Sequence, residues 1–409
     1  MRKTIVYRLM TPVRYFINDS RSTGVMLIVC TIVSLLVSNA FSSGGNYRFF
    51  WQKEIHYPFT SVHLPHSVVD WVNNFLMGIF FVLAGTEIKR ELTAGELSSF
   101  KKAVLPFGAA LGGMLVPALL FVSFNAEHTQ FIRGWGIPTA TDIAFSLGIA
   151  SLLGKKVPLN IKMLLMALAI IDDLGAIVVI ALFYGSKISW LFLAAAAVVY
   201  AALLACNYFK LKFGVVQVVL GLLLWYFVLQ SGIEASISGV LFAFAVPVKQ
   251  LAIVEKYIHY PVNFFILPLF ALANTAVLIP PDIGGAIQSP VGLGVTIGLV
   301  AGKPLGIFFV CSILVSLGIA RLPTNVNWRQ ILGMGMLAGI GFTMSIFTTT
   351  LAFNDALARD TALVAIIISV CLSSILSMAY FSGMHRESVM HKNRKLPTIK
   401  MQPELAASD

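Results

Sequence analysis

The sequence predicts an all-α polytopic membrane protein with about 12 transmembrane helices. Of its 409 residues, 58% are hydrophobic and only 11% are charged, whereas soluble domains carry about 25% charge. The mean hydropathy is +0.86. The chain is also divided into apolar runs of the length that a helix needs to cross a bilayer, about 20 residues each.

The apolar runs predict one helix each. The two shortest ranges, 213–228 and 231–247, also fit a single re-entrant pair. In chain order, the predicted helices are 21–40, 68–92, 104–124, 131–152, 159–183, 189–208, 213–228, 231–247, 258–279, 291–317, 328–353 and 361–383.

Residues 21–383 therefore form the predicted transmembrane domain, between a cytoplasmic N-terminus (1–20) and a basic, polar cytoplasmic tail (384–409). The basic start, the apolar run and Ser38-Asn39-Ala40 resemble a cleavable signal peptide. The long basic lead and the many later spans favour an uncleaved first helix. The polar connection 41–67 predicts an extracytoplasmic hairpin that contacts a second copy of the chain, or an irregular loop.

The basic residues predict the orientation of the chain. With both ends in the cytoplasm, 23 of the 29 lysines and arginines fall in inside segments and five in outside segments, as the positive-inside rule requires. The net charge of +11 is therefore explained by topology and not by a nucleic-acid partner. The four cysteines lie in apolar runs without metal-ligand spacing, which predicts packing residues.

Two adjacent carboxylates, Asp172 and Asp173, lie near the middle of the apolar run 164–182. A charge at bilayer depth costs at least about 3 kcal/mol, and such residues usually face a cavity or a partner. Two neighbouring like charges require that one be protonated or that a cation bind between them. The pair therefore predicts a site that alternates between protons and a metal cation.

The fourth and eleventh spans carry helix-breaking residues followed by polar ones. Pro138 precedes Thr141 and Asp142, and four glycines from 333 to 341 precede Thr343. Unpaired backbone at bilayer depth is tolerated where it lines a cavity or is buried in protein. The two spans are predicted to be discontinuous helices that cross at a central site, within inverted repeats of spans 3–5 and 10–12.

One lysine, Lys303, lies inside the tenth span. Asp142 is predicted to balance the positive N-terminal ends of the broken helices, and Lys303 their negative C-terminal ends. Lys303 equally fits a pair with Asp172 or Asp173. The residues alone leave these arrangements open.

A second group of charges lies at predicted cytoplasmic helix ends. It predicts either local ion pairs or a pH-responsive cluster at the entrance, because histidine titrates near neutral pH. Glu234 lies on the opposite side and fits an interfacial residue. The members of the group are Glu87, Arg90, Glu91, Glu255 and His259.

Several motifs resemble those of the NhaA family of sodium/proton antiporters, and the resemblance extends from about residue 10 to residue 385. The motifs are Gly85–Leu92, Thr139–Phe145, Ala169–Ala176, Leu267–Ala271 and Gly302–Gly306.

The resemblance implies an electrogenic, pH-regulated antiporter of the bacterial inner membrane that exports Na⁺ or Li⁺ against entering protons, without a cofactor. It implies that Asp172 and Asp173 bind cation and proton, with Thr141 and Asp142 nearby and Lys303 as a charge partner. It also implies that the five charged residues named above form the pH-response region, and that the chain forms homodimers through 41–67. Two departures, Glu234 and Lys256, replace histidines expected from the resemblance, so the pH range of activation is not predicted.

Two other classes of function fit the sequence less well. A cation-coupled symporter needs groups that bind an organic solute, and the sequence has no such cluster beyond the cation ligands. An intramembrane aspartyl protease needs aspartates on two facing helices, whereas Asp172 and Asp173 are neighbours on one. HExxH and GxSxG motifs are absent from the sequence.

Overall fold

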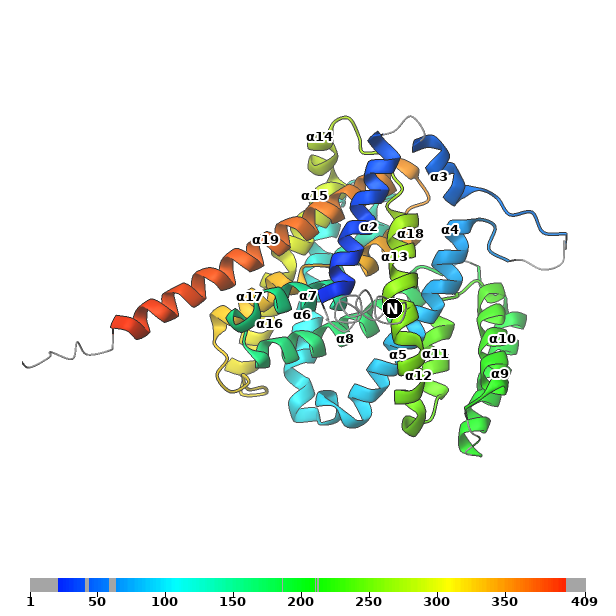
Figure 1. Ribbon diagram of the computed structural model, residues 1–409, viewed down its shortest axis with the longest axis horizontal. Helices are drawn as coiled ribbons and strands as arrows, with labels where there is room; N and C mark the ends of the chain where they lie inside the picture. The colour runs from blue at the N-terminus through cyan, green and yellow to red at the C-terminus, as the bar shows by residue number, and fades with distance from the viewer. Residues whose placement is uncertain are drawn as a thin grey trace, which may run out of the picture.

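A computed structural model describes residues 21–40, 44–58, 64–185, 187–209, 211 and 213–394 (Figure 1). In these residues the regular secondary structure is helical, and the one β contact is an isolated bridge between Glu54 and Ser67. The predicted all-helical class is confirmed.

The first half of the chain forms helices that follow the predicted apolar runs. They are α2 (Arg21–Ala40), α3 (Gly44–Gln52), α4 (Val68–Trp71), η1 (Val72–Leu76), α5 (Met77–Ala94), η2 (Glu96–Ser98), α6 (Phe100–Phe124), η3 (Ile132–Thr139), α7 (Ile143–Leu152), η4 (Gly154–Lys156), α8 (Leu159–Phe183) and α9 (Trp190–Tyr208).

The second half is built in the same way. Its helices are α10 (Val215–Ser231), α11 (Ile237–Ala245), α12 (Val248–Pro261), η5 (Val262–Ile266), α13 (Leu267–Asn274), α14 (Ile283–Gln288), α15 (Pro290–Ile297), η6 (Gly298–Gly302), α16 (Lys303–Ser316), α17 (Trp328–Ala338), α18 (Thr343–Ala352) and α19 (Ala356–Arg394).

Seven helices in the described residues are long and apolar enough to cross a membrane, or eight if α17 and α18 form one span. Every predicted range contains helix, but several of these helices are shorter than a bilayer requires. The predicted count of about twelve transmembrane helices is therefore not confirmed by helix length alone.

The first described part of the segment 41–67 is helical, which was not predicted. Gly44–Gln52 is the helix α3, and its Tyr47 hydroxyl donates a hydrogen bond of 3.1 Å to the carbonyl oxygen of Leu272. The buried ring of Trp51 also holds α3 against the bundle. Beyond α3, the bridge from Glu54 to Ser67 is the one pairing of β type, and residues 59–63 lie outside the described part.

Both ranges predicted to be broken helices contain an interruption. The axes of α17 and α18 differ by 51° across the non-helical residues 339–342. In the fourth range, η3 ends at Thr139 and α7 begins at Ile143, so residues 140–142 are extended. The two interruptions touch, because the backbone N–H of Asp142 donates a hydrogen bond of 2.8 Å to the carbonyl oxygen of Ile340.

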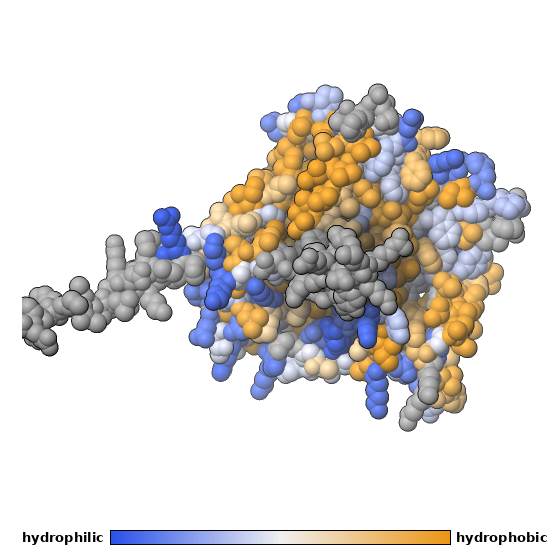
Figure 2. Space-filling view, viewed as in Figure 1, coloured by the Kyte–Doolittle hydropathy of each residue, from blue (hydrophilic) through white to orange (hydrophobic). Residues whose placement is uncertain are grey.

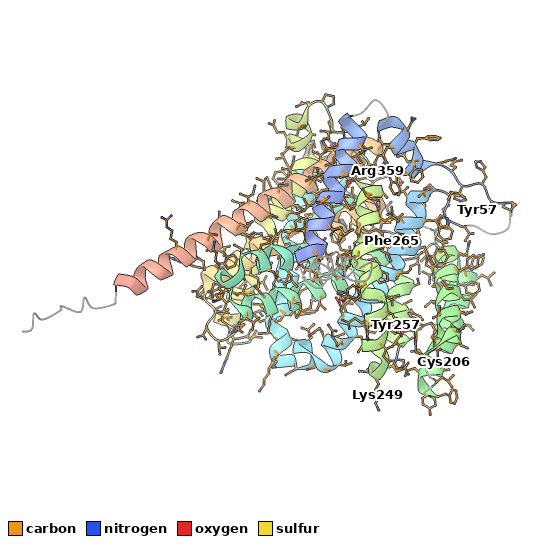
Figure 3. The ribbon with its side chains drawn as sticks, viewed as in Figure 1. Tyr57, Cys206, Lys249, Tyr257, Phe265 and Arg359 are labelled. Atoms are coloured by element: carbon orange, nitrogen blue, oxygen red, sulfur yellow. The ribbon has the colours of Figure 1, made fainter. Side chains whose placement is uncertain are left out.

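The two ends of the bundle differ in charge. Figure 3 places Lys249 at the lower edge and Arg359 near the top. The α5–α6 and α16–α17 connections lie on the same side as Lys249 (Figure 1). We call this side, with Lys101, Lys102, Lys249 and Arg321, the basic end, and the opposite side the α3 end.

Exposed apolar side chains cover the flanks between these ends. Figure 2 shows hydrophobic residues over α2, where Val29, Ile32 and Leu36 are exposed, and over the paired helices α9 and α10. Helix α6 also presents an exposed stripe of Phe107, Leu115 and Leu119. Such surfaces suit a bilayer, where lipid chains cover them.

Helices α6 and α16 approach closely through glycine. A Cβ added to Gly306 would meet the carbonyl oxygen of Gly112, and a Cβ added to Gly112 would meet that of Gly306. Small residues at such crossings let the two backbones touch. This contact sets the position of Lys303, which begins α16.

We expect Gly306→Val to lower the stability by about 1–3 kcal/mol, since the added methyl groups must separate two packed backbones. The apparent midpoint of thermal unfolding in detergent measures the change. Gly383→Val is the matched control, because nothing lies within 4 Å of a Cβ at that position. Equal midpoints for the two variants would contradict the close crossing.

Candidate cation-binding site

Asp172 and Asp173 lie in the middle of α8, and both are buried, with 0% and 5% of their surface exposed. The two carboxylates face different surroundings. Asp172 is enclosed by protein groups, whereas Asp173 lines a cavity. The predicted pair is thus divided into an inner and an outer member.

Asp172 forms an ion pair with Lys303, with 2.9 Å between its Oδ2 atom and the lysine Nζ atom. Lys303 is also completely buried, and its Nζ atom donates a second hydrogen bond to the carbonyl oxygen of Thr139. The sequence left open which aspartate pairs with Lys303, and in the structure that partner is Asp172. The bond to Thr139 places the ammonium group at the C-terminal end of η3, where the helix dipole is negative.

Thr141 connects Asp172 to the second broken helix. Its hydroxyl lies 2.7 Å from Asp172 Oδ2 and 2.9 Å from the carbonyl oxygen of Ala338, the last residue of α17. A hydroxyl has one proton, so it donates to one of these acceptors at a time. The protonation state of Asp172 can therefore change the partner of Thr141.

Asp142 lies between the N-terminal ends of α7 and α18. Its Oδ1 atom accepts a hydrogen bond of 2.9 Å from the backbone N–H of Phe145. Its Oδ2 atom accepts bonds of 3.0 Å from the backbone N–H and 2.8 Å from the hydroxyl of Thr343. A carboxylate at two positive helix ends is the arrangement predicted for Asp142.

Asp173 faces a cavity of about 270 Å³ that also includes Thr141, Asp142 and Thr343. Its buried Oδ1 atom has no hydrogen-bond partner among the described residues. The rim includes His259 on the exposed face of α12, a helix that begins at the basic end. The cavity therefore connects the carboxylate of Asp173 with an exposed residue of α12, the helix that begins at the basic end.

Three phenylalanines close the cavity toward the α3 end. The ring of Phe347 lies 5.7 Å from that of Phe81 and 6.4 Å from that of Phe270, and all three are nearly completely buried. Phe347 is one helical turn from Met344, which still lines the Asp173 cavity. The sequence gives no signal for these three residues, because all predicted spans but the first contain phenylalanine.

A second cavity of about 250 Å³ lies on the far side of Phe347. Its lining includes Glu234 and the amides of Asn73 and Asn274, which exchange hydrogen bonds of 3.0 and 2.8 Å. Glu234 precedes α11, on the side opposite His259, in agreement with its predicted side. The phenylalanines thus separate two polar cavities.

Most of the predicted charge cluster is brought together, because Glu87, Arg90, Glu91 and Glu255 lie close enough to interact electrostatically. Arg90 pairs with both carboxylate oxygens of Glu255 at 2.6 Å. Glu87 and His259 line the cavity of Asp173, whereas Glu91 is not among the lining residues. The ion pair of Arg90 with Glu255 and the lining residues Glu87 and His259 thus lie on the same two helices, α5 and α12.

The described residues include no group of three or more His, Cys, Asp or Glu side chains arranged to hold a metal ion. The available donors are carboxylate, hydroxyl and carbonyl oxygens, which suit hard cations. The four cysteines are free. The site therefore offers oxygen atoms that suit a hard cation, next to two buried carboxylates.

Comparisons with known proteins agree with this geometry. The family model described as Na⁺/H⁺ antiporter 1 matches residues 14–381. A Na⁺/H⁺ antiporter NhaA 2 of Clostridium beijerinckii is 41% identical over 97% of this chain and 99% of its own. A Na⁺/H⁺ antiporter NhaA of Flavobacterium psychrophilum is 45% identical over 90% and 94%.

A third relative, the Na⁺/H⁺ antiporter NhaA of Cytophaga hutchinsonii, is 44% identical over 92% of this chain and 96% of its own. These matches confirm the resemblance seen in the motifs and indicate a transporter rather than an enzyme. The chain belongs to the Na⁺/H⁺ antiporter 1 family, the NhaA antiporters.

Proposed function

We propose that this antiporter exports Na⁺ or Li⁺ in exchange for entering protons, by alternating access at Asp172 and Asp173. The observation that carries the proposal is the asymmetry of the pair. Asp173 faces a cavity that reaches the exposed residue His259, whereas Asp172 is buried and paired with Lys303.

Protons and cations compete for the same oxygens. Asp173 releases its proton into the cavity, and the resulting carboxylate binds the cation together with the oxygens of Thr141 and Asp142. After the site turns to the other side, protons displace the cation. Because the two aspartates are neighbours, they titrate as a pair.

Two carboxylates at one site provide for two protons per cation. Exchange in this ratio moves net positive charge inward in each cycle, so the membrane potential drives Na⁺ out. One proton per cation moves no net charge. Dependence of the exchange rate on an imposed membrane potential therefore tests the electrogenic part of the proposal.

The phenylalanine barrier supports the assignment of this conformation to the inward-open state. The basic end is proposed to be cytoplasmic, from the positive-inside rule, and both termini are proposed to lie on that side. Phe81, Phe270 and Phe347 then close the extracytoplasmic route, and the second cavity receives the cation when they separate.

The remaining features complete the proposal. The chain crosses the bacterial inner membrane about 12 times, with inverted repeats and two discontinuous spans that cross at residues 140–142 and 339–342. It needs no cofactor, and it forms a homodimer through 41–67. The exposed side chains of Phe49 and Phe50 on α3 support a contact there.

Glu87, Arg90, Glu91, Glu255 and His259 are proposed to regulate exchange by pH. We expect Arg90→Gln to move the activation profile to higher pH by roughly half to one unit, with the maximal rate within about twofold. Without the guanidinium, the carboxylates repel one another and release their protons only at higher pH. Rates measured from pH 6 to 9 test the shift.

Lys249→Gln is the matched control for the pH prediction. It removes one positive charge from an exposed position of α12, the helix that carries Glu255. We expect its profile to follow the parent protein. If Arg90→Gln and Lys249→Gln give the same profile, the cluster does not set the pH range.

Proton movement in everted membrane vesicles tests the proposed function as a whole. Vesicles from cells without their own antiporters are given an acid interior, and Na⁺, Li⁺ or K⁺ is added at several pH values with a pH-sensitive dye. Collapse of the gradient by Na⁺ and Li⁺ supports the proposal. No response from inserted protein would contradict it and favour a solute symporter.

A further inference from the structure

A third cavity, of about 340 Å³, lies away from the transport route at the basic end, and we call it the basic cavity. Three segments that are distant in sequence meet around it. They are the start of α6, the start of α8 and the connection between α16 and α17. Its lining residues are Lys101, Lys102, Leu105, Pro106, Asn160, Met163, Leu164, Ala167, Arg321, Pro323 and Thr324.

The basic cavity is divided into a charged rim and an apolar floor. Lys101, Lys102 and Arg321 are exposed at the rim, whereas Leu105 and Leu164 are buried. The lining residues include no acidic side chain. Asn160 holds the rim in place, because its side-chain amide donates a hydrogen bond of 2.7 Å to the carbonyl oxygen of Thr324. The cavity therefore suits an amphiphile with an anionic head.

The local helix favours an anion at the same position. Lys101 and Lys102 lie in the first turn of α6, which contains no acidic residue. The N-cap residue Ser99 makes no capping hydrogen bond with its side chain. The N-terminal end of a helix carries partial positive charge, and the two lysines add to it, so this position attracts an anion.

The position of the basic cavity decides between a lipid and a soluble anion. Phe107, Leu111, Leu115 and Leu119 recur at every fourth residue along α6, directly after the cavity lining, and all are exposed. Met163 at the floor is also partly exposed. This stripe faces lipid chains in a bilayer, so the cavity opens at the boundary between protein and lipid.

We propose that the basic cavity binds one anionic phospholipid of the cytoplasmic leaflet. The phosphate lies among Lys101, Lys102 and Arg321, and the first part of an acyl chain lies against Leu105, Pro106 and Met163. Basic pockets between membrane helices on this side of the membrane are suited to anionic head groups. The assignment to the cytoplasmic leaflet rests on the orientation proposed above for the chain. The binding test below does not depend on transport activity.

The test uses the purified full-length protein in a neutral detergent. Phosphatidylglycerol or phosphatidylcholine with the same acyl chains is titrated in, and the midpoint of thermal unfolding is followed. We expect phosphatidylglycerol to raise the midpoint more than phosphatidylcholine. For the triple variant Lys101→Gln, Lys102→Gln, Arg321→Gln, we expect the apparent affinity for phosphatidylglycerol to fall at least about tenfold.

The matched control is the triple variant Lys155→Gln, Lys249→Gln, Lys256→Gln. It removes the same charge from exposed residues that do not line the basic cavity. We expect this control to keep the response of the parent protein. If the cavity variant does not fold, Arg321→Gln in the connecting segment and Lys249→Gln take the places of the two triple variants, with a loss of about threefold expected for Arg321→Gln.

Three results would overturn the proposal. The first is equal stabilisation by phosphatidylglycerol and phosphatidylcholine. The second is an equal loss of the response in the cavity variant and its control, which indicates a general effect of charge. The third is stabilisation by inorganic phosphate at the same concentration, which assigns the basic cavity to a soluble anion.

Discussion

Vesicles containing the Asp173→Asn variant are expected to show no Na⁺-driven or Li⁺-driven proton movement at any pH. The carboxylate of Asp173 faces the cavity, and its Oδ1 atom has no protein partner among the described residues. Asparagine has nearly the same shape, but its amide carries no charge and does not exchange a proton in this range. The substitution therefore removes cation binding and proton binding together.

The control for this prediction is Glu54→Gln, at an exposed position outside the site. It also neutralises one carboxylate, and we expect full exchange activity. Both variants must be shown to be inserted in equal amounts, by immunoblot of the membrane fraction. Exchange by Asp173→Asn at even a tenth of the parent rate would remove Asp173 from its proposed role.

The central site could be predicted from the sequence because charges are rare in apolar runs. Asp172, Asp173 and Lys303 are conspicuous there, and Pro138 and the glycines of the eleventh range marked both interruptions. The partner of Lys303 could not be chosen from the residues alone. That choice depends on where α16 crosses α6, which Gly112 and Gly306 set by direct backbone contact.

Other features gave no usable signal. The alternation of aromatic and polar residues in 41–67 suggested a hairpin, but Gly44–Gln52 forms α3, where Tyr47 and Trp51 find partners on the bundle. In this segment, packing against the bundle determines the backbone conformation more strongly than the local sequence pattern does. Phe81, Phe270 and Phe347 form a barrier only because three helices bring them together, and all predicted spans but the first contain phenylalanine.

The largest effect on stability is expected from Lys303→Met. Asp172 and Lys303 are both completely buried, and 2.9 Å separates their charged atoms. Methionine fills much of the space of lysine but leaves the carboxylate without its counter-charge. Breaking a buried pair from one side costs about 3–5 kcal/mol. We expect a clearly lower midpoint of thermal unfolding in detergent.

The double variant Asp172→Asn, Lys303→Met separates charge from packing. With both charges removed, the amide that replaces the carboxylate no longer requires a cation, and Thr141 still donates to a neutral oxygen. Replacing a whole buried pair by neutral groups is often harmless, so we expect the double variant to regain most of the lost stability. A midpoint as low as that of Lys303→Met would mean that the lysine acts through packing, and the ion pair would then have no structural role.

If stability returns in the double variant while exchange does not, the ion pair serves transport and not the fold. Asp173 and the cavity remain unchanged in this variant, so a cation can still reach the outer carboxylate. Loss of exchange then assigns to the Asp172–Lys303 pair a share of the proton or cation cycle that Asp173 alone does not supply. Lys303→Met and the double variant together thus show whether the carboxylate of Asp172 stabilises the fold or takes part in exchange.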